Sequence, residues 1–293
     1  MENTRTVKRK IATVGKIEQI TKAMKVVATN RLRKVEQRAL ALARFGERLK
    51  TTAGRLSAGL GEDAHPLLVK RSPVRKATII VIGGDRGLCG AYNTNLLRVF
   101  VQLAEMRRQI HELSYVAVGA RVAKTLPKRG FELVEAFDEV DSSPLSPLPA
   151  SLAGLAQARF LSGAADEVLV IHTHYVNPLV YQPVQMTLLP LEPPRRAGLD
   201  SEQVDESRPY EFEPSAQALL SRLLPIYLET ELEAMLLESS ASEYAARVAS
   251  MTSASDNAAD MIKVLTLNYN RLRQAAITSE LLEVATGAEA LNG

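Results

Sequence analysis

Hydrophobic residues recur every seven positions along the first 65 residues of the chain. Six of the eight positions in this row are Val or Leu, and the row runs Val7, Val14, Thr21, Ala28, Val35, Leu42, Leu49 and Leu56. The companion row three residues on is mixed, since it begins Lys10, Ile17, Met24, Arg31, Arg38 and Phe45. A seven-residue repeat is typical of a helix that pairs with another helix. We therefore predict a coiled-coil helix over residues 1–65.

The C-terminal segment, residues 214–293, carries a stronger repeat. One row is Tyr227, Ala234, Ala241, Val248, Ser255, Ile262, Tyr269 and Ala276, and the row three residues on is Thr230, Leu237, Tyr244, Met251, Ala258, Leu265 and Leu272. A sustained seven-residue period predicts left-handed supercoiling with a partner helix. Ser215 suits the start of this helix, and Pro225 predicts a kink in its first turns.

The two terminal segments are expected to pair with each other and run antiparallel. All 14 prolines lie from Pro66 to Pro225, so residues 1–65 and 226–293 are free of proline. Residues 1–50 hold 14 Lys and Arg against 4 Asp and Glu, whereas residues 226–293 hold 4 against 10, and these opposite charges favour pairing. Periodicity alone favours an ordinary antiparallel hairpin, such as a tethering or scaffold coil.

Residues 74–192 have the pattern of an α/β domain. Short β-branched or apolar runs predict strands at Ala77–Gly83, Tyr115–Gly119, Glu132–Phe137 and Glu167–His172, with Val180–Leu189 as an antiparallel edge. Helical patterns at Asn93–His111, Arg121–Arg129 and Leu152–Leu161 separate them. Loops are expected at Ser142–Pro149 and Glu192–Pro214, and residues 193–213 are treated as a linking loop.

The predicted fold class is therefore α/β: a long antiparallel coiled coil of the N- and C-terminal helices plus a Rossmann-like α/β domain with a mostly parallel sheet. Composition agrees with a soluble chain, since no apolar run reaches the length that a membrane-spanning helix needs and Met1–Lys10 lacks a secretory signal. Cys89 is the single cysteine, which excludes an internal disulfide and fits a reducing compartment.

Candidate chemistry is sparse. The loop Gly83–Gly90 lies between a strand and a helix, where phosphates often bind, but it matches neither G-x-G-x-x-G nor the P-loop. His172 and His174 share one strand face and suggest a metal, but a packed pair is the simpler interpretation because no other metal motif accompanies them. Cys89 suits a small buried hydrophobe better than a nucleophile. We expect no catalytic residue, no cofactor and no metal, and an enzyme using the loop should bind ATP or NAD as an isolated chain.

Nucleic-acid binding is the other alternative, because the N-terminal segment is strongly basic. Phe45 is the only aromatic residue in the first 60, so no stacking platform accompanies the charge. The basic residues also spread round the predicted helix instead of forming one stripe. A basic helix facing an acidic protein surface fits equally well, and no nucleic-acid partner is expected.

Three segments together resemble the gamma subunit of F-type ATP synthases. They are Lys10–Val14 with Ile20–Ala28, Asp85–Gly90 with Asn93, and Ser255–Ala258 with Leu265–Arg271, Arg273–Thr278, Glu280–Leu281 and Gly287–Ala288. Departures from the family pattern are Gly15–Ile17, Gln19 and Gly84, which concern local packing. One cysteine excludes the dithiol loop of the chloroplast members. The chain begins at the family's first helix without a transit peptide, which suggests a bacterial origin.

The resemblance implies a non-catalytic central stalk that rotates inside a ring of alpha and beta subunits and couples proton-driven rotation of the membrane rotor ring to ATP synthesis and hydrolysis on that ring. Its α/β domain would contact the epsilon subunit and the rotor-ring c subunits. Membrane association would come only through the complex, at the cytoplasmic face of the bacterial inner membrane. By similarity, contacts with the catalytic ring are expected at Arg247, Arg273, Gln274, Thr278 and Glu280, with Met24 on the first helix.

Overall fold

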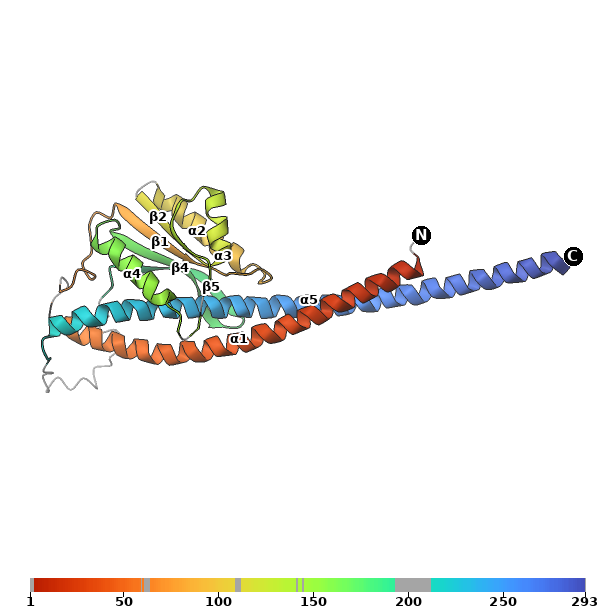
Figure 1. Cartoon of the computed structure of the whole chain (residues 1–293), viewed down its shortest axis with the longest axis horizontal. Helices are drawn as coiled ribbons and strands as arrows, with labels where there is room; N and C mark the ends of the chain where they lie inside the picture. Colours follow the sequence, from red (N-terminus) through yellow and green to blue (C-terminus); the bar gives the residue numbers. More distant parts are fainter. Residues whose placement is uncertain are drawn as a thin grey trace. The chain divides into compact units, whose positions relative to one another are not determined.

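The computed structural model describes residues 3–58, 60, 64–108, 112–140, 142, 143, 145–192 and 212–292 (Figure 1). Its elements in chain order are α1 (Thr4–Ala58), β1 (Lys76–Ile82), α2 (Tyr92–Arg108), β2 (Glu112–Val118), α3 (Ala120–Thr125), the short 3-10 helix η1 (Pro127–Arg129), β3 (Leu133–Phe137), α4 (Leu148–Leu161), β4 (Glu167–Asn177), β5 (Val180–Leu189) and α5 (Ala216–Asn292). These elements confirm the predicted fold class.

The chain forms two compact units that differ from the predicted segment boundaries. Unit 1 comprises Met1–Thr29 and Arg247–Gly293, and unit 2 comprises Asn30–Ala246. Unit 2 thus contains the sheet and the parts of both long helices nearest to it in sequence. The reason is that α5 contributes Leu228, Leu232 and Leu236 to the same hydrophobic core as the sheet.

The sheet of unit 2 has the order β3-β2-β1-β4-β5. The first four strands pair in parallel, and β5 pairs antiparallel with β4, which confirms the predicted antiparallel edge. Alternate residues of β1 serve two cores. Ile79 packs with α2 and α3 on one face, whereas Ile80 packs with α4 and α5 on the other. Both faces are covered, so the central strands read as continuous apolar runs.

Several element boundaries differ from the prediction, and β2 begins at Glu112, three residues before the predicted Tyr115. β4 continues to Asn177, five residues past His172, because its second half pairs with β5 as a hairpin outside the apolar core. α4 begins at Leu148 and includes Pro149, which is tolerated in a first turn where the amide has no helical partner. The predicted helix Arg121–Arg129 is divided in two, because α3 ends at Thr125 and η1 begins at Pro127. Of the predicted loop Glu192–Pro214, residues 193–211 lie outside the described part of the chain.

The seven-residue row of α1 is confirmed, whereas its mixed companion row is buried only in part, with Met24 and Arg38 half-buried. All eight positions from Val7 to Leu56 are buried or half-buried, whereas Lys10, Ile17, Arg31 and Phe45 are exposed. The second buried row lies four residues on and contains Ile11, Glu18, Lys25, Leu32, Ala39, Gly46 and Ala53. Positions three and four residues away both neighbour the first row. In α1 the positions four residues on are the ones that pack, and small residues there allow another helix to approach closely.

Both predicted rows of α5 are buried or half-buried as far as Leu272. The helix begins after Ser215, whose Oγ accepts a hydrogen bond from the Ala218 amide at 3.2 Å, as an N-cap does. It continues through Pro225 as one helix. Within the described residues, no helix combines the length and the hydropathy that crossing a membrane requires.

The two long helices run antiparallel in unit 2. Arg31 lies over the ring of Tyr244, Arg38 pairs with Glu233, and Gly46 faces Thr230, so partner numbers fall as α1 numbers rise. Leu32 and Val35 form an apolar cluster with α5 between these polar contacts. The Arg38 pair shows how opposite charge on the two ends contributes directly to their association.

Asp166 ties the start of β4 to the start of β1. Its Oδ2 accepts hydrogen bonds from the amides of Arg75 at 2.9 Å and Lys76 at 3.0 Å, and Arg71 lies 3.5 Å from Oδ1. The Arg75 amide, with those other donors, lowers the pKa of Asp166 below its ordinary value although burial acts in the opposite direction. The carboxylate therefore stabilises the fold more strongly when it is ionised than when it is protonated.

We expect Asp166→Asn to lower the free energy of unfolding by about 1–2 kcal/mol at pH 7, because charge-assisted hydrogen bonds become neutral ones. The pKa of Asp166 is lower in the folded chain than in the unfolded chain, so its ionised form adds to the free energy of unfolding above roughly pH 4. This contribution is lost as pH falls through the folded pKa. Urea unfolding of both proteins at pH 7 and near pH 3 checks this. A difference that does not shrink in acid would contradict the assignment.

Candidate functional site

The C-terminal end of α5 in unit 1 exposes every side chain from residue 273 to residue 288. Apolar side chains are among them: Ile277 is 49% exposed, Leu281 is 65% exposed and Val284 is 70% exposed. Their spacing of four and then three residues places these three on one helix face. An apolar face without cover within the described chain is the signature of a surface that meets another protein.

The polar residues predicted for partner contact fall into two pairs beside this face. Arg273 and Glu280 are seven residues apart and share one side of α5, whereas Gln274 and Thr278 are four apart and share the neighbouring side. Thr278 Oγ1 donates to the Gln274 carbonyl at 3.0 Å. All four side chains are exposed. The structure therefore brings four of the six predicted residues together on one helix end.

The other two predicted residues lie apart from this group. Arg247 is on α5, 26 residues before Arg273, and only 8% of it is exposed. Met24 is half-buried on α1. A partner could reach little of the Arg247 side chain, so its predicted contact has much less surface to act through than those of the exposed four.

Hydroxyl groups along α5 of unit 1 bond to their own helix. Each Oγ1 donates to the carbonyl four residues earlier, at 2.8 Å for Thr252, 2.7 Å for Thr266, 3.0 Å for Thr278 and 2.8 Å for Thr286. Such bonding uses the one proton that a threonine can donate. These side chains therefore have no proton left to donate to a partner.

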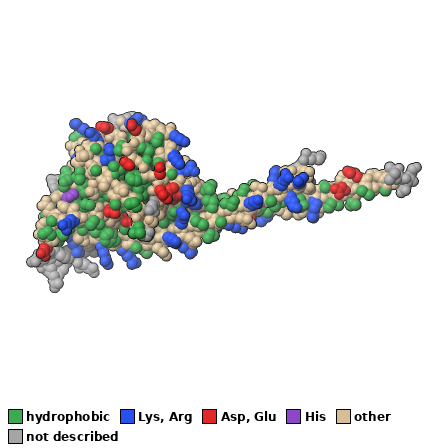
Figure 2. All heavy atoms as spheres, viewed as in Figure 1, with side chains coloured by type: hydrophobic (Ala, Val, Ile, Leu, Met, Phe, Trp, Pro, Cys, Tyr) green, Lys and Arg blue, Asp and Glu red, His purple; other side chains and the backbone are tan. Residues whose placement is uncertain are grey.

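The α1 part of unit 1 adds a basic surface. Residues 3–29 contain seven Lys and Arg and one acidic residue, Glu18. Figure 2 shows Lys and Arg side chains gathered around the N-terminal end of this helix. Lys22 pairs with Glu18 at 2.5 Å, and Arg5, Lys8, Arg9 and Lys16 are also exposed. This surface suits an acidic protein partner.

The loop Gly83–Gly90 in unit 2 is hydrogen-bonded to neighbouring parts of the chain. Asp85 accepts hydrogen bonds from the amides of Ala120, at 3.2 Å, and Val140, at 3.1 Å. The Gly84 amide donates to Asn93 Oδ1 at 3.0 Å, and a β-carbon at Gly84 would lie 2.9 Å from the Glu243 carboxyl group. The carboxylates of Asp85 and Glu243 thus lie at this loop, and their charge disfavours a phosphate there.

Cys89 packs inside this loop. It is 2% exposed, its Sγ lies 3.6 Å from the Arg86 carbonyl, and Asn93 Nδ2 donates to Sγ at 3.3 Å. Tyr92 and Ala246 form an apolar cluster with it. Burial with neutral neighbours is typical of a structural cysteine. The sequence interpretation of Cys89 as a small buried hydrophobe agrees with this packing.

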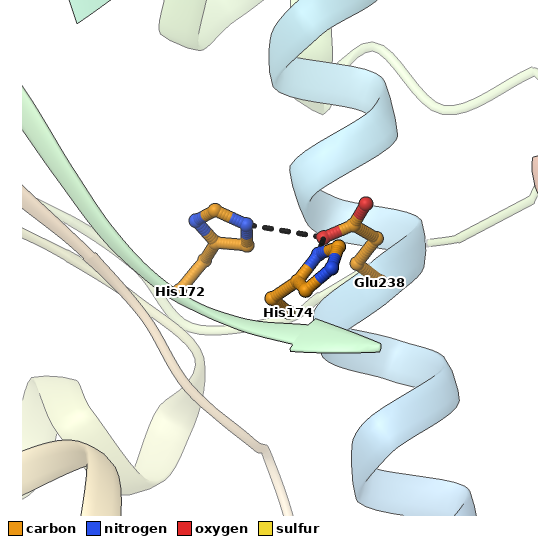
Figure 3. A group of neighbouring side chains, drawn as sticks. All are labelled: His172, His174 and Glu238. Carbon is orange, nitrogen blue, oxygen red and sulfur yellow. Dashed lines mark hydrogen bonds and ion pairs between the residues drawn. The ribbon is translucent and has the colours of Figure 1, made fainter. Parts of the chain in front are cut away.

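The two histidines of β4 meet a carboxylate that sequence reasoning missed (Figure 3). Glu238 Oε2 on α5 lies 3.2 Å from His172 Nε2 and 2.8 Å from His174 Nδ1. Burial raises the pKa of Glu238, but the hydrogen bonds and charges of the two histidines outweigh it and leave the pKa below its usual value. Glu238 carries no local motif, because it comes 64 residues after His174. Each imidazole has Glu238 as a hydrogen-bond partner, although His172 Nδ1 is buried without one among the described residues, and together the three residues offer metal-ligating atoms.

Comparisons with known proteins agree along the whole length. The family model described as ATP synthase matches residues 3–291. The ATP synthase gamma chain of Pelotomaculum thermopropionicum is 39% identical over 99% of this chain and 100% of its own length. That of Desulfitobacterium hafniense is 37% identical over 99% and 100%.

Solved structures agree in fold. A chain of the Euglena gracilis mitochondrial ATP synthase, in an OSCP/F1/c-ring structure, aligns with a TM-score of 0.67 at 19% identity, covering 98% of this chain and 94% of that one. A chain of the Tetrahymena thermophila mitochondrial ATP synthase central stalk and c-ring gives 0.58 at 22% identity, covering 80% and 99%. With the sequence relatives and the paired terminal helices, these likenesses lead to one conclusion: the chain belongs to the ATP synthase gamma family.

Proposed function

We propose that unit 1 is the part of this chain that turns against the alpha and beta subunits of ATP synthase. The chain is a non-catalytic stalk subunit and a peripheral part of a membrane-bound complex. Its proposed partners are the alpha, beta and epsilon subunits and the rotor-ring c subunits. The proposed location is the cytoplasmic face of the bacterial inner membrane.

One observation carries this proposal. The end of α5 exposes Ile277, Leu281 and Val284 beside the polar pairs Arg273 with Glu280 and Gln274 with Thr278. The same helix buries its seven-residue rows up to Leu272, so the exposed end is the part left for a partner. An apolar stripe bordered by polar groups has the composition of a protein contact.

Coupling follows from asymmetry. One α5 end presents an apolar side, an Arg and Glu side and a Gln and Thr side, so a surrounding ring with repeated subunits meets a different side in each rotary position. A catalytic subunit then changes state according to the difference in contact free energy among these sides. The nucleotide chemistry takes place on the partners, and this chain supplies the bias.

The first experiment is reconstitution of the full chain with matching alpha and beta subunits. We expect a stable complex whose ATPase activity depends on this chain. If the chain is folded but does not assemble with competent partners, the result contradicts the proposal and favours the scaffold-coil interpretation.

Replacing both Arg273 and Gln274 by alanine should reduce coupled ATP synthesis by roughly fivefold or more, on the scale of about 1 kcal/mol for a side chain that contributes to an interface. ATP synthesis in reconstituted vesicles measures this, with circular dichroism to show unchanged helicity. The matched control replaces Asp260 and Lys263, an exposed pair 2.9 Å apart on the same helix. Wild-type coupling in the Arg273 and Gln274 variant would defeat the assignment.

A further inference from the structure

His172, His174 and Glu238 place three metal-ligating atoms in one small region of unit 2. One nitrogen from each histidine and one carboxylate oxygen all lie within 4.8 Å of one another. Two residues of spacing on β4 put both imidazoles on one face of the strand, and α5 supplies the carboxylate opposite (Figure 3). A divalent ion would need only small side-chain movements to contact all three.

The supporting backbone is held on both sides of these ligands. The Thr173 amide, between the two histidines, donates to Ser239 Oγ at 3.2 Å, and Ser242 Oγ donates to the Thr173 carbonyl at 3.3 Å. Thr173, Ser239 and Ser242 are all buried. These bonds fix β4 against α5 at the position of the cluster, as a preorganised ligand set requires.

Access to the cluster is graded. The His172 side chain is 1% exposed, whereas that of His174 is 46% exposed and that of Glu238 is 30% exposed. An ion can therefore enter from the His174 side and keep solvent on its outer face. Imidazole nitrogen with carboxylate oxygen is a donor set that suits Zn²⁺, and three protein ligands plus water is the composition of an open zinc site.

We propose that His172, His174 and Glu238 bind one Zn²⁺ ion, with water in the remaining position. The ion takes the place of the hydrogen bonds between Glu238 and the two rings: each ring nitrogen gives its lone pair to zinc, and a neutral ring carries its proton on its other nitrogen. Bound zinc joins β4 to α5 within unit 2 and stabilises the folded chain in proportion to its occupancy. The proposal is independent of the rotary function proposed above.

The test uses the full chain purified without an affinity tag. Isothermal titration with ZnCl₂ gives affinity and stoichiometry, and Co²⁺ as a probe gives visible absorption bands if the site is four-coordinate. Variants are His174→Ala, at a half-exposed side chain, and Glu238→Gln, which keeps the side-chain size. His65→Ala is the matched control, because it removes an imidazole outside the cluster.

We expect one Zn²⁺ per chain and a melting temperature that rises by a few degrees with zinc. Both cluster variants should bind at least tenfold more weakly, since loss of even an outer-shell partner typically costs about 10-fold to 100-fold. His65→Ala should bind like the wild type. No saturable binding by the wild type, or undiminished binding in both cluster variants, would overturn the proposal and leave the cluster as a hydrogen-bonded link between β4 and α5.

Discussion

Replacing Phe100 by alanine should lower the free energy of unfolding by about 3–5 kcal/mol, the usual cost of removing a large aromatic side chain from a packed core. Phe100 is fully buried on α2. Its ring meets those of Tyr115 at 5.5 Å and Phe131 at 4.8 Å, both edge-to-face, and these two rings lie 5.2 Å apart. The substitution removes one member of a mutually packed triad and leaves a cavity between α2 and the sheet.

Urea unfolding followed by circular dichroism measures the loss. Met106→Ala is the matched control, because Met106 lies on the same helix with 66% of its surface exposed and should change stability by less than about 0.5 kcal/mol. A similar small effect at Phe100 would mean that α2 is not packed as described.

Replacing Asp85 by alanine should cost about 2–4 kcal/mol, because two backbone amides lose an ionised acceptor. Those amides belong to Ala120, at the start of α3, and Val140, which follows β3. The carboxylate also complements the N-terminal end of α3. Asp85 thus links three parts of the chain that are distant in sequence.

Thermal and urea unfolding of Asp85→Ala check this, with Arg86→Ala as the control at the adjacent exposed position. The stability of Asp85→Asn should fall between those of Asp85→Ala and the wild type, since an amide oxygen still accepts a hydrogen bond. Titration of the wild type with ATP completes the test of the loop. Stability unchanged in Asp85→Ala together with saturable ATP binding would favour a ligand role for Gly83–Gly90.

The sequence predicted those elements of the fold that bury a continuous or regularly repeated apolar pattern. β1 is predictable because residues buried on both faces of a sheet form a continuous apolar run, and Ile79 to Ile82 are such a run. The outer half of β4 was missed because its stability comes from pairing with β5, where Tyr175 faces Tyr181, and not from an apolar run. The second buried row of α1 was missed because Ala39, Gly46 and Ala53 are small and weakly hydrophobic, although their size is what close helix packing uses.

Site residues were less accessible to sequence reasoning. The contact residues of α5 came from a family resemblance, and periodicity could not show that Arg247 would be largely buried while Arg273 would be exposed. Spacing identified His172 and His174 as a pair. It could not find Glu238, because only the packing of β4 against α5 brings that carboxylate within 3.2 Å.

The threonines of α5 that donate to their own helix affect how easily the proposed shaft can turn inside its ring. A hydrogen bond between a shaft and its bearing has to break each time the shaft turns, and each broken bond adds a barrier to rotation. Thr252, Thr266, Thr278 and Thr286 donate their hydroxyl protons within their own helix, so these side chains offer a neighbour methyl groups and oxygen acceptors but no donor. Dispersion contacts of that kind are individually weak and exchange one partner for another with little cost. We therefore expect the threonine positions to make weak contacts with the proposed ring and the few charged side chains to make the stronger ones.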